Sequence, residues 1–237
     1  MERLSRGTSN AGHYDEAIRA LQTDLIVVTE PGSGFIDRYP EALCSPPQRP
    51  SSHGAESWIA LVGQDLEATT LELPYNRLAV AAQTVILGQP VAIYGSVLPW
   101  NAARSQAPDV YGEEEIPLEE LFRRAITAQV ADVKSLQNHF GIHNVFWAGD
   151  FNHPLVGPLS GFSKAARELI ADSLESLGMR AFNQEAANSS SGACTIDLIC
   201  GSVEHDVVNS ETLAPRLGDK PLSDHNAYVI DVRWPLA

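Results

Sequence analysis

The sequence predicts an α+β (mixed α/β) fold, organised as a single domain over residues 1–237. Segments with a strand pattern outnumber those with helical spacing, and the helices are interspersed among the strands. No internal repeat, low-complexity tract or interdomain linker divides the chain. With 44% hydrophobic and 19% charged residues, the composition is that of a globular protein and excludes a disordered one.

The strand candidates are short β-branched or alternating apolar runs that end at turn residues. The first covers residues 24–30 and ends at Glu30, before Pro31-Gly32. The further candidates are residues 58–62, 68–73, 78–87, 91–98, 145–148, 194–200, 205–208 and 227–232. Between two of them, Gly88-Gln89 predicts a hairpin turn.

Three segments have the apolar spacing of an amphipathic helix. They are residues 13–22, residues 116–140, and a segment that begins at Ser163 and ends at the stop signal Gly178. Residues 31–55 and 99–115 are rich in Pro, Gly and polar residues, which predicts two long loops.

The charge balance limits the partners of the protein. Sixteen Lys and Arg against thirty Asp and Glu give a net charge of −14. Binding of long nucleic acid rests on neutralising phosphates with basic side chains, so the net charge argues against a protein that holds nucleic acid by a broad basic face. An enzyme that meets phosphate through a metal ion is still compatible with this charge.

The cysteines and the apolar runs predict a cytoplasmic protein without a membrane span. Three cysteines cannot pair completely, and Cys194 and Cys200 would lie roughly 20 Å apart along one strand, too far for a disulfide. Reduced, buried cysteines are therefore expected. No signal peptide and no stretch of about 20 apolar residues is visible in the sequence.

Four clusters place an acid or a His at the end of a predicted strand, where loops deliver side chains to a common rim. They are Glu30, Gly149-Asp150-Phe151-Asn152, Asp197 within residues 195–199, and Ser223-Asp224-His225. The side chains of Asp150 and Asn152 point the same way in extended chain. Side by side, the Asp150 carboxylate could orient a water, and the Asn152 carboxamide could hold a phosphoryl oxygen. An Asx turn that ends the strand is the alternative interpretation.

Asp197 is an acid inside a strongly apolar strand, and a buried carboxylate is costly unless it is paired. We expect it to orient a His, although a place on the wet face of an edge strand is the alternative. Adjacent side chains diverge, so Asp224 can serve a metal while Asp197 fixes the tautomer of His225. For Glu30 alone, a solvated strand end is the alternative.

In chain order, the strand ending at Glu30, residues 94–100 (YGSVLPW), GDFN (149–152), TIDLI (195–199) and SDH (223–225) resemble the endonuclease/exonuclease/phosphatase superfamily. Its members include DNase I-like nucleases, abasic-site endonucleases, sphingomyelinases and inositol-polyphosphate phosphatases. The resemblance runs over nearly the whole chain and implies a four-layer α/β/β/α two-sheet sandwich.

The resemblance also implies hydrolysis of a phosphodiester or phosphomonoester with Mg²⁺, or with Mn²⁺ as a second option. By that resemblance, Glu30 holds the metal and Asp224 lies beside it. Asp150 orients or deprotonates the attacking water, Asn152 holds the phosphate, and Asp197 orients His225, which contacts the phosphoryl oxygens. A hard cation that takes few carboxylates and several waters agrees with this set.

Two departures from the family pattern stand out. Members begin with a core strand that ends in an Asn, whereas residues 1–7 look like the loop after it, so we expect the chain to lack the first core strand and its Asn. Many family nucleases carry a His in the strand-end segment where Val97 stands here. Asn101, just beyond it, is a candidate to compensate.

These observations favour a metal-dependent phosphoesterase, a nuclease-like hydrolase acting on short nucleic acid or a small phosphoester. The acidity and the presence of only three lysines disfavour long DNA. A catalytically impaired, truncated member of the same fold that serves as a binding module is the alternative. A serine hydrolase lacks its nucleophile-elbow motif.

Overall fold

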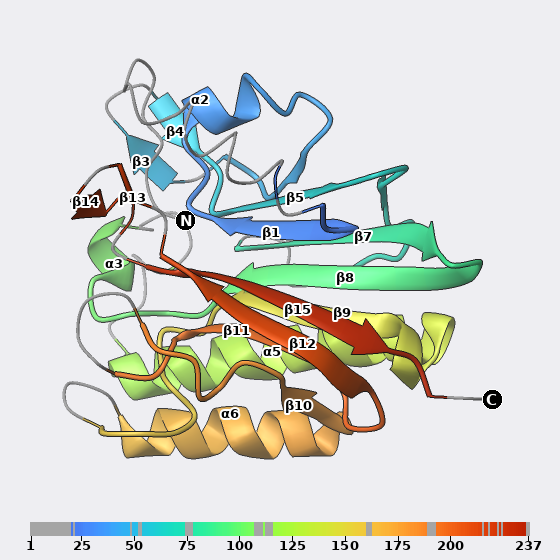
Figure 1. Ribbon diagram of the computed structural model, residues 1–237. Coiled ribbons are helices and arrows are strands. Elements are labelled where there is room, and N and C mark those ends of the chain that lie inside the picture. The colour runs from blue at the N-terminus through green and yellow to red at the C-terminus, as the bar shows by residue number, and fades with distance from the viewer. Residues whose placement is uncertain are drawn as a thin grey trace.

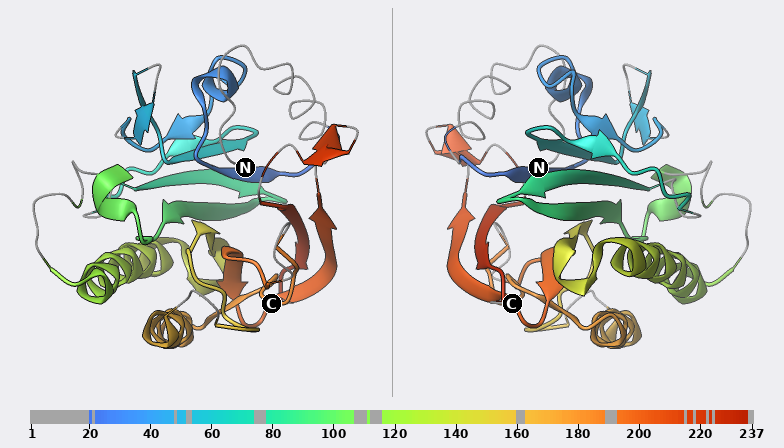
Figure 2. Two further views of the ribbon diagram at one scale, coloured as in Figure 1. Left: turned by 90° about the vertical axis from the view of Figure 1, so that its left-hand side faces the viewer. Right: turned by 90° about the vertical axis from the view of Figure 1, so that its right-hand side faces the viewer.

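A six-stranded sheet carries two long helices on one face and a second layer of strands on the other (Figures 1 and 2). The computed structural model describes residues 20, 22–47, 49–51, 54–73, 78–106, 111, 116–159, 163–188, 193–214, 216–217, 219–221, 223 and 225–235. The strand order of the large sheet is β10-β11-β9-β8-β7-β6. Its strands are β6 (Glu67–Ala68), β7 (Ala79–Ile86), β8 (Gln89–Val97), β9 (Val145–Asp150), β10 (Met179–Ala181) and β11 (Asp197–Ser202).

Only β8 and β9 run parallel in this sheet. A parallel pair needs a long crossover, and α5 (Leu118–Phe140) provides it. Its apolar stripe and that of α6 (Lys164–Ser176) pack on the sheet in one core that includes Trp147 and Ile126. The short helix α3 (Ala103–Gln106) and the 3-10 turn η1 (Ile142–Asn144) lie before and after α5.

The second layer consists of two smaller sheets. One has the order β1-β5-β2, from β1 (Leu25–Thr29), β5 (Ile59–Gly63) and β2 (Leu43–Cys44). The other pairs β12 (Asp206–Leu213) with β15 (Ala227–Arg233). Ile59 and Leu61 of β5 pack against Ile93 of the large sheet between the layers. Minor hairpins form from β3 (Arg49–Ser51) with β4 (Gly54–Glu56) and from β13 (Arg216–Leu217) with β14 (Lys220–Pro221).

A short helix, α2 (Ser33–Ile36), covers the outside of the second layer. Phe35 and Tyr39 stack on each other and pack with Val28. The molecule thus has the predicted order of layers, helices over the large sheet, then the strand layer, then α2 (Figure 2).

The structure corrects several predicted element boundaries. Residues 31–55 are not one loop, because they contain α2 and the strands β2 to β4, and the aromatic residues Phe35 and Tyr39 pack in a core with Val28. The predicted strand 68–73 shrinks to Glu67–Ala68, and the predicted strand 194–200 begins only at Asp197. The predicted loop 99–115 contains α3, and the predicted helix 13–22 lies almost entirely outside the described residues.

The β7–β8 hairpin turns one residue earlier than predicted. Leu87 and Gly88 hold the turn with φ values of 50° and 79°, while Gln89 already pairs with Ile86. Two positive φ values are what a two-residue turn of the right twist requires.

The expectation of buried cysteines is met only by Cys200, since Cys44 and Cys194 are partly exposed, although all three are free thiols. Among the described helices, none is long and apolar enough to cross a membrane.

Candidate active site

Four strand ends meet at one end of the sandwich. β1 finishes just before Glu30, and β9 finishes at Asp150. β11 begins at Asp197, which lies directly opposite Asp150 in the antiparallel pairing. β15 begins two residues after His225. The structure therefore brings the acids and the His from four separate parts of the sequence to one place.

The turn after β9 fixes Asp150 and Asn152. Gly149 has a φ of 146°, and a Cβ there would lie 1.9 Å from the Ser96 carbonyl oxygen, so only glycine lets β9 approach β8 so closely. The Asn152 backbone N–H donates to Asp150 Oδ1 at 2.7 Å, and the Asn152 side-chain amide donates to the Leu98 carbonyl at 2.8 Å. The Asx turn is thus present, and it is also what orients both side chains.

A hydrogen bond between the side chains of Asp197 and His225 joins β11 to the segment before β15. His225 Nδ1 lies 2.7 Å from Asp197 Oδ2. Thr195 Oγ1 accepts the backbone N–H of Asp197 at 3.0 Å, and Asn183 donates its side-chain amide to the Asp197 carbonyl at 2.8 Å. On the other side, Ser223 Oγ accepts the backbone N–H of His225 at 3.1 Å. Both members of the pair are therefore held by their own neighbours.

The electrostatics of the site favour a charged imidazole. Burial lowers the pKa of His225, but the hydrogen bond and charge of Asp197, together with the charge of Asp150, outweigh it and raise the pKa to about 9. Burial raises the pKa of Asp150 well above its ordinary value, and the charge of Asp197 adds to this effect. The nearby His225 partly opposes the rise.

Glu30 belongs to the same electrostatic neighbourhood. Its negative charge contributes to the raised pKa of Asp150. Its backbone has a φ of 50°, and its N–H donates to the Trp58 carbonyl at 2.8 Å, so the strand end is bent and anchored there. Asp224, predicted beside the metal, lies outside the described residues.

Within the described part of the chain, no three His, Cys, Asp or Glu side chains cluster closely enough to form a metal site by themselves. The donor chemistry nevertheless fits Mg²⁺, which takes one or two carboxylates and completes its shell with water. After burial, the charges of Asp197 and Glu30 add to the raised pKa of Asp150, so these carboxylates lie near one another. Glu30 is the described carboxylate that could hold such an ion.

The departure at Val97 has a structural consequence. Val97 is 2% exposed and packs in the core between the two layers, so its side chain is part of that core. Asn101, the candidate replacement, lies exposed in the turn before α3.

Sequence reasoning missed the residues that hold Asp197 in place. Asn183 is 3% exposed and uses both ends of its amide, because it also accepts the Ile199 N–H at 2.9 Å. A buried Asn after a short apolar segment is a weak signal in a sequence. Thr195 lies two residues before Asp197, the spacing at which a Thr hydroxyl bonds local backbone, and that pattern could have been recognised.

Solved structures share the fold of this chain but have little sequence similarity to it. No family model matches this chain, and no curated protein matches it. An endonuclease/exonuclease/phosphatase from Bacteroides vulgatus superposes with a TM-score of 0.64 at 15% identity, over 95% of this chain and 90% of that one. The human Nocturnin catalytic domain with bound sulfate superposes with a TM-score of 0.61 at 19% identity, over 95% and 86%.

A third structure, D. rerio TDP2 complexed with a single-strand DNA product, superposes with a TM-score of 0.55 at 12% identity, over 94% and 91% of the two chains. At these identities the similarity is one of fold, and it extends over nearly the whole of each chain.

Proposed function

The chain has the endonuclease/exonuclease/phosphatase (DNase I-like) fold, and from this premise we propose that it is a metal-dependent phosphoesterase acting as a single domain. The observation that carries the proposal is the Asp197–His225 pair at 2.7 Å, set beside Asp150 at the meeting point of the strand ends. An Asp197–His225 ion pair that served only stability would not need Asp150 beside it, because a further buried carboxylate repels Asp197 and lowers the stability of the fold.

The substrate phosphate would be held by two groups of this chain. His225 is charged at neutral pH, and with Nδ1 bound to Asp197 its Nε2–H points away from Asp197, ready to donate to a phosphoryl oxygen. Asn152 donates one hydrogen of its side-chain amide to the Leu98 carbonyl, and the second hydrogen would donate to the phosphate. These donors are fixed before the substrate arrives, so little reorganisation is needed as charge develops.

Asp150 would activate the water. A carboxylate with a raised pKa is a stronger base than an ordinary Asp, and the nearby His225 charge helps to keep it ionised. In its ionised form Asp150 orients the water and takes its proton as the water attacks phosphorus and the ester oxygen departs.

Glu30 and Asp224 are the residues proposed to hold Mg²⁺, or Mn²⁺ in its place. When bound there, the ion would neutralise the phosphate charge that accumulates in the transition state.

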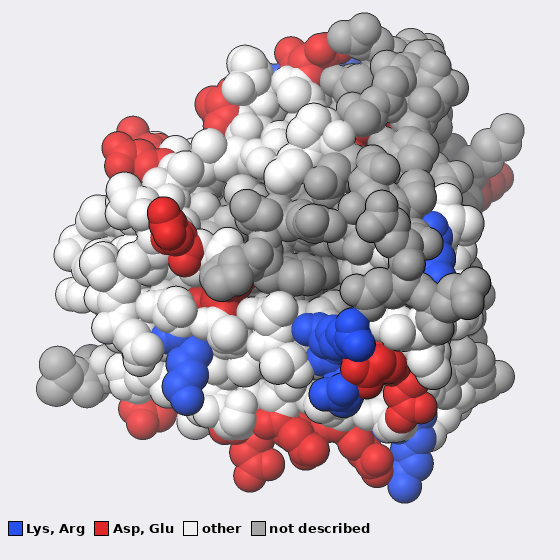
Figure 3. All heavy atoms as spheres, turned by 180° about the vertical axis from the view of Figure 1, so that it is seen from behind, with Lys and Arg blue, Asp and Glu red and all other residues white. Residues whose placement is uncertain are grey.

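The proposed substrate is short nucleic acid or a small phosphoester. Figure 3 shows acidic side chains along the lower edge of the back face, and α6 alone exposes Glu168, Asp172 and Glu175. With a net charge of −14, this surface repels a long polyanion. The DNA product bound to the TDP2 structure is single-stranded, which is compatible with a short or unpaired substrate.

A fluorogenic phosphodiester tests the proposal. We expect hydrolysis with Mg²⁺, none with EDTA, and recovery when Mg²⁺ is restored. His225→Ala should lower kcat by roughly 10²- to 10³-fold, because a fixed donor to the developing charge is lost. His139→Ala, an exposed His at the end of α5, should leave kcat unchanged.

Equal hydrolysis with and without EDTA would refute the metal mechanism. Binding of the phosphodiester without turnover would favour the alternative, an impaired binding module of the same fold.

A further inference from the structure

Arg104, in α3, is a partly buried arginine with two unbonded guanidinium nitrogens. Its Nε and Nη2 atoms are buried and have no hydrogen-bond partner among the described residues. Arg167, the other partly buried arginine whose side chain is described, instead donates to the carbonyls of Val156, Gly157 and Pro158. Nitrogen atoms withdrawn from water without an acceptor are costly, and more so when the group is charged. Arg104 therefore needs an acceptor that the described chain does not supply.

The two unbonded atoms form one edge of the guanidinium. Nε–H and Nη2–H point in parallel, a fork that matches two oxygens of a phosphate group. Because this edge makes no hydrogen bond to the described residues, turning it toward a ligand breaks none. Arg104 is only partly buried and has a long side chain, so a rotation of that side chain brings the fork to the surface. The chemistry of Arg104 thus fits an oxyanion that presents two oxygens on one side.

The segment that leads into α3 belongs to the candidate site. Leu98, the residue after β8, accepts the side-chain amide of Asn152. The ring of Trp100 lies 4.8 Å from that of Trp58 between centroids, and the Trp58 carbonyl accepts the Glu30 N–H. Figure 1 shows α3 beside the end of β8, at the end of the sandwich where β15 begins.

Arg104 lies a short way from the groups proposed to hold the scissile phosphate. It follows Leu98 by six positions, and the last four form a turn and helix that advance about 1.5 Å per residue, so the two Cα atoms are at most roughly 13 Å apart. The Trp100 carbonyl accepts the Ala103 N–H at 2.9 Å, which keeps this turn tight. A cation at this position would meet a group of the substrate that neighbours the scissile phosphate.

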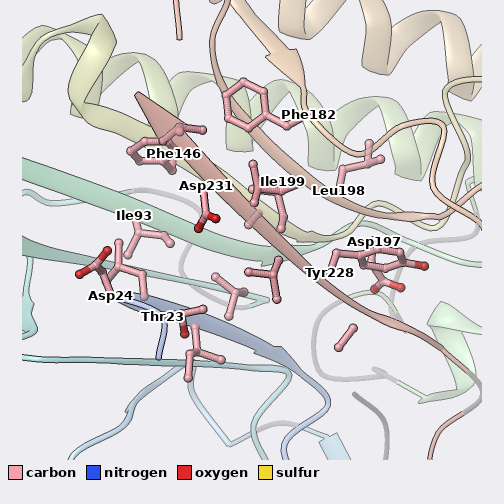
Figure 4. A pocket seen from close by; sticks show the side chains of 18 of the residues that line it. Thr23, Asp24, Ile93, Phe146, Phe182, Asp197, Leu198, Ile199, Tyr228 and Asp231 are labelled. Atoms are coloured by element: carbon pink, nitrogen blue, oxygen red, sulfur yellow. The ribbon is translucent and has the colours of Figure 1, made fainter. Parts of the chain in front are cut away.

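The side of the site toward β15 is acidic. A cavity of about 310 Å³ between β1 and β15 reaches the site at Asp197 (Figure 4). The charged residues that line it are Asp24, Asp197 and Asp231, with no Lys or Arg among the described lining residues. These carboxylates repel a further phosphate. An anionic substrate would therefore extend from the site toward α3.

We propose that Arg104 binds a second phosphate of the substrate, next to the one that is cleaved. The substrate class is then a phosphoester with two neighbouring phosphates, from a short nucleic-acid strand or from a small molecule. The preference for two phosphates rests on the proposed function, whereas binding of a phosphate at Arg104 does not.

The test measures binding in EDTA, so that no metal-dependent cleavage occurs. The probes are a thymidine dinucleotide without a terminal phosphate and its forms with a 5′-phosphate or a 3′-phosphate, with Kd from NMR titration. We expect at least one phosphorylated form to bind about tenfold more tightly than the unphosphorylated form, because the added phosphate gains charge-assisted hydrogen bonds.

Substitutions assign this gain in affinity to Arg104. In Arg104→Gln the gain should disappear, and the affinity for the unphosphorylated dinucleotide should stay unchanged, which also shows that the variant is folded. Arg104→Lys should keep part of the gain, because an ammonium group retains the charge and lacks the fork. Lys134→Gln removes the same charge from an exposed position on α5 and should leave the gain unchanged.

The guanidinium can also be observed directly. The Nε–H NMR signal of Arg104, assigned by its absence in Arg104→Gln, should shift with the phosphorylated dinucleotide and not with the unphosphorylated one. Inorganic pyrophosphate distinguishes the two sources of the second phosphate. An equal shift with pyrophosphate supports a small molecule, and a shift with the dinucleotide alone supports a nucleic-acid strand.

Two results would overturn the proposal. One is no gain in affinity from either terminal phosphate, or a gain that persists in Arg104→Gln. The other is a shift of the Arg104 signal, without ligand, when the acid run 113–115 is replaced by Gln. That run lies outside the described residues, and it would then be the partner of Arg104. Because the probes are not cleaved, these results are distinct from failure of the phosphoesterase proposal, which the assay with Mg²⁺ and EDTA tests.

Discussion

At the scale of residues, Asp197 organises the candidate site. Its carboxylate meets His225, and its charge also reaches Tyr228, whose pKa is raised to about 12 by burial first and by Asp197 in addition. The sequence indicated this role from one feature, an acid inside an apolar strand. Which His it meets follows from geometry, because Asp197 and His225 are brought together only by the placement of β11 and β15.

The pair makes stability depend on pH in a defined direction. Folding raises the pKa of His225 from 6.5 to about 9, so the folded state binds this proton more tightly than the unfolded state. The resulting stabilisation is complete below about pH 6.5 and is lost as the pH rises through about 9. Its size is up to roughly 3 kcal/mol.

In Asp197→Asn we expect the pKa of His225 to fall toward its ordinary value and the loss of stability at alkaline pH to shrink. NMR titration of the imidazole gives the pKa, and urea unfolding at pH 6 and pH 9.5 gives the stability. Asp231→Asn, an exposed acid on β15, is the control. An imidazole that still titrates near pH 9 in Asp197→Asn would show that Asp197 is not the cause.

At the scale of elements, periodicity located most long elements and missed the short ones. For β12 it predicted residues 205–208, whereas the strand runs over Asp206–Leu213. The helices α5 and α6 and the strands β1, β7, β8 and β15 lie within a few residues of their predicted ranges. β10, with three residues, is too short to show an alternation, and β6 is shorter than its apolar run because only two of its residues find a partner in β7. Pairing, and not local pattern, decides where a short strand ends.

The start of α6 offers a test of a local signal. Ser163 was predicted to begin this helix, and its Oγ accepts the Ala166 N–H at 3.3 Å. Ser163→Ala removes that acceptor and should cost about 1 kcal/mol of unfolding free energy, measured in urea. Ser135→Ala, at an exposed position inside α5 where the hydroxyl bonds back to Ala131, should be neutral or slightly stabilising. Equal losses in the two variants would contradict a specific capping role.

At the scale of the whole molecule, the net charge of −14 repels an anionic substrate as it approaches the protein. Four of the thirty acids are proposed as site groups, and the other acids surround the site with a field that repels a polyanion. Salt screens this field, with a Debye length near 10 Å at 0.1 M.

Raising the ionic strength from about 20 to about 150 mM at constant free Mg²⁺ should therefore lower the KM for a single-stranded oligonucleotide, by about two- to fivefold. The KM for a small, singly charged phosphodiester should change little, which makes it the internal control. A KM that rises with salt for the oligonucleotide would reveal a basic binding face and contradict the prediction.

The sequence alone determined the fold class, the long elements, and the residue types at the strand ends, because these depend on local periodicity and on motifs that are contiguous in the chain. Tertiary structure decided how they combine. The pairing of Asp197 with His225, the raised pKa of Asp150 and the support from Asn183 arise from strands that are distant in sequence.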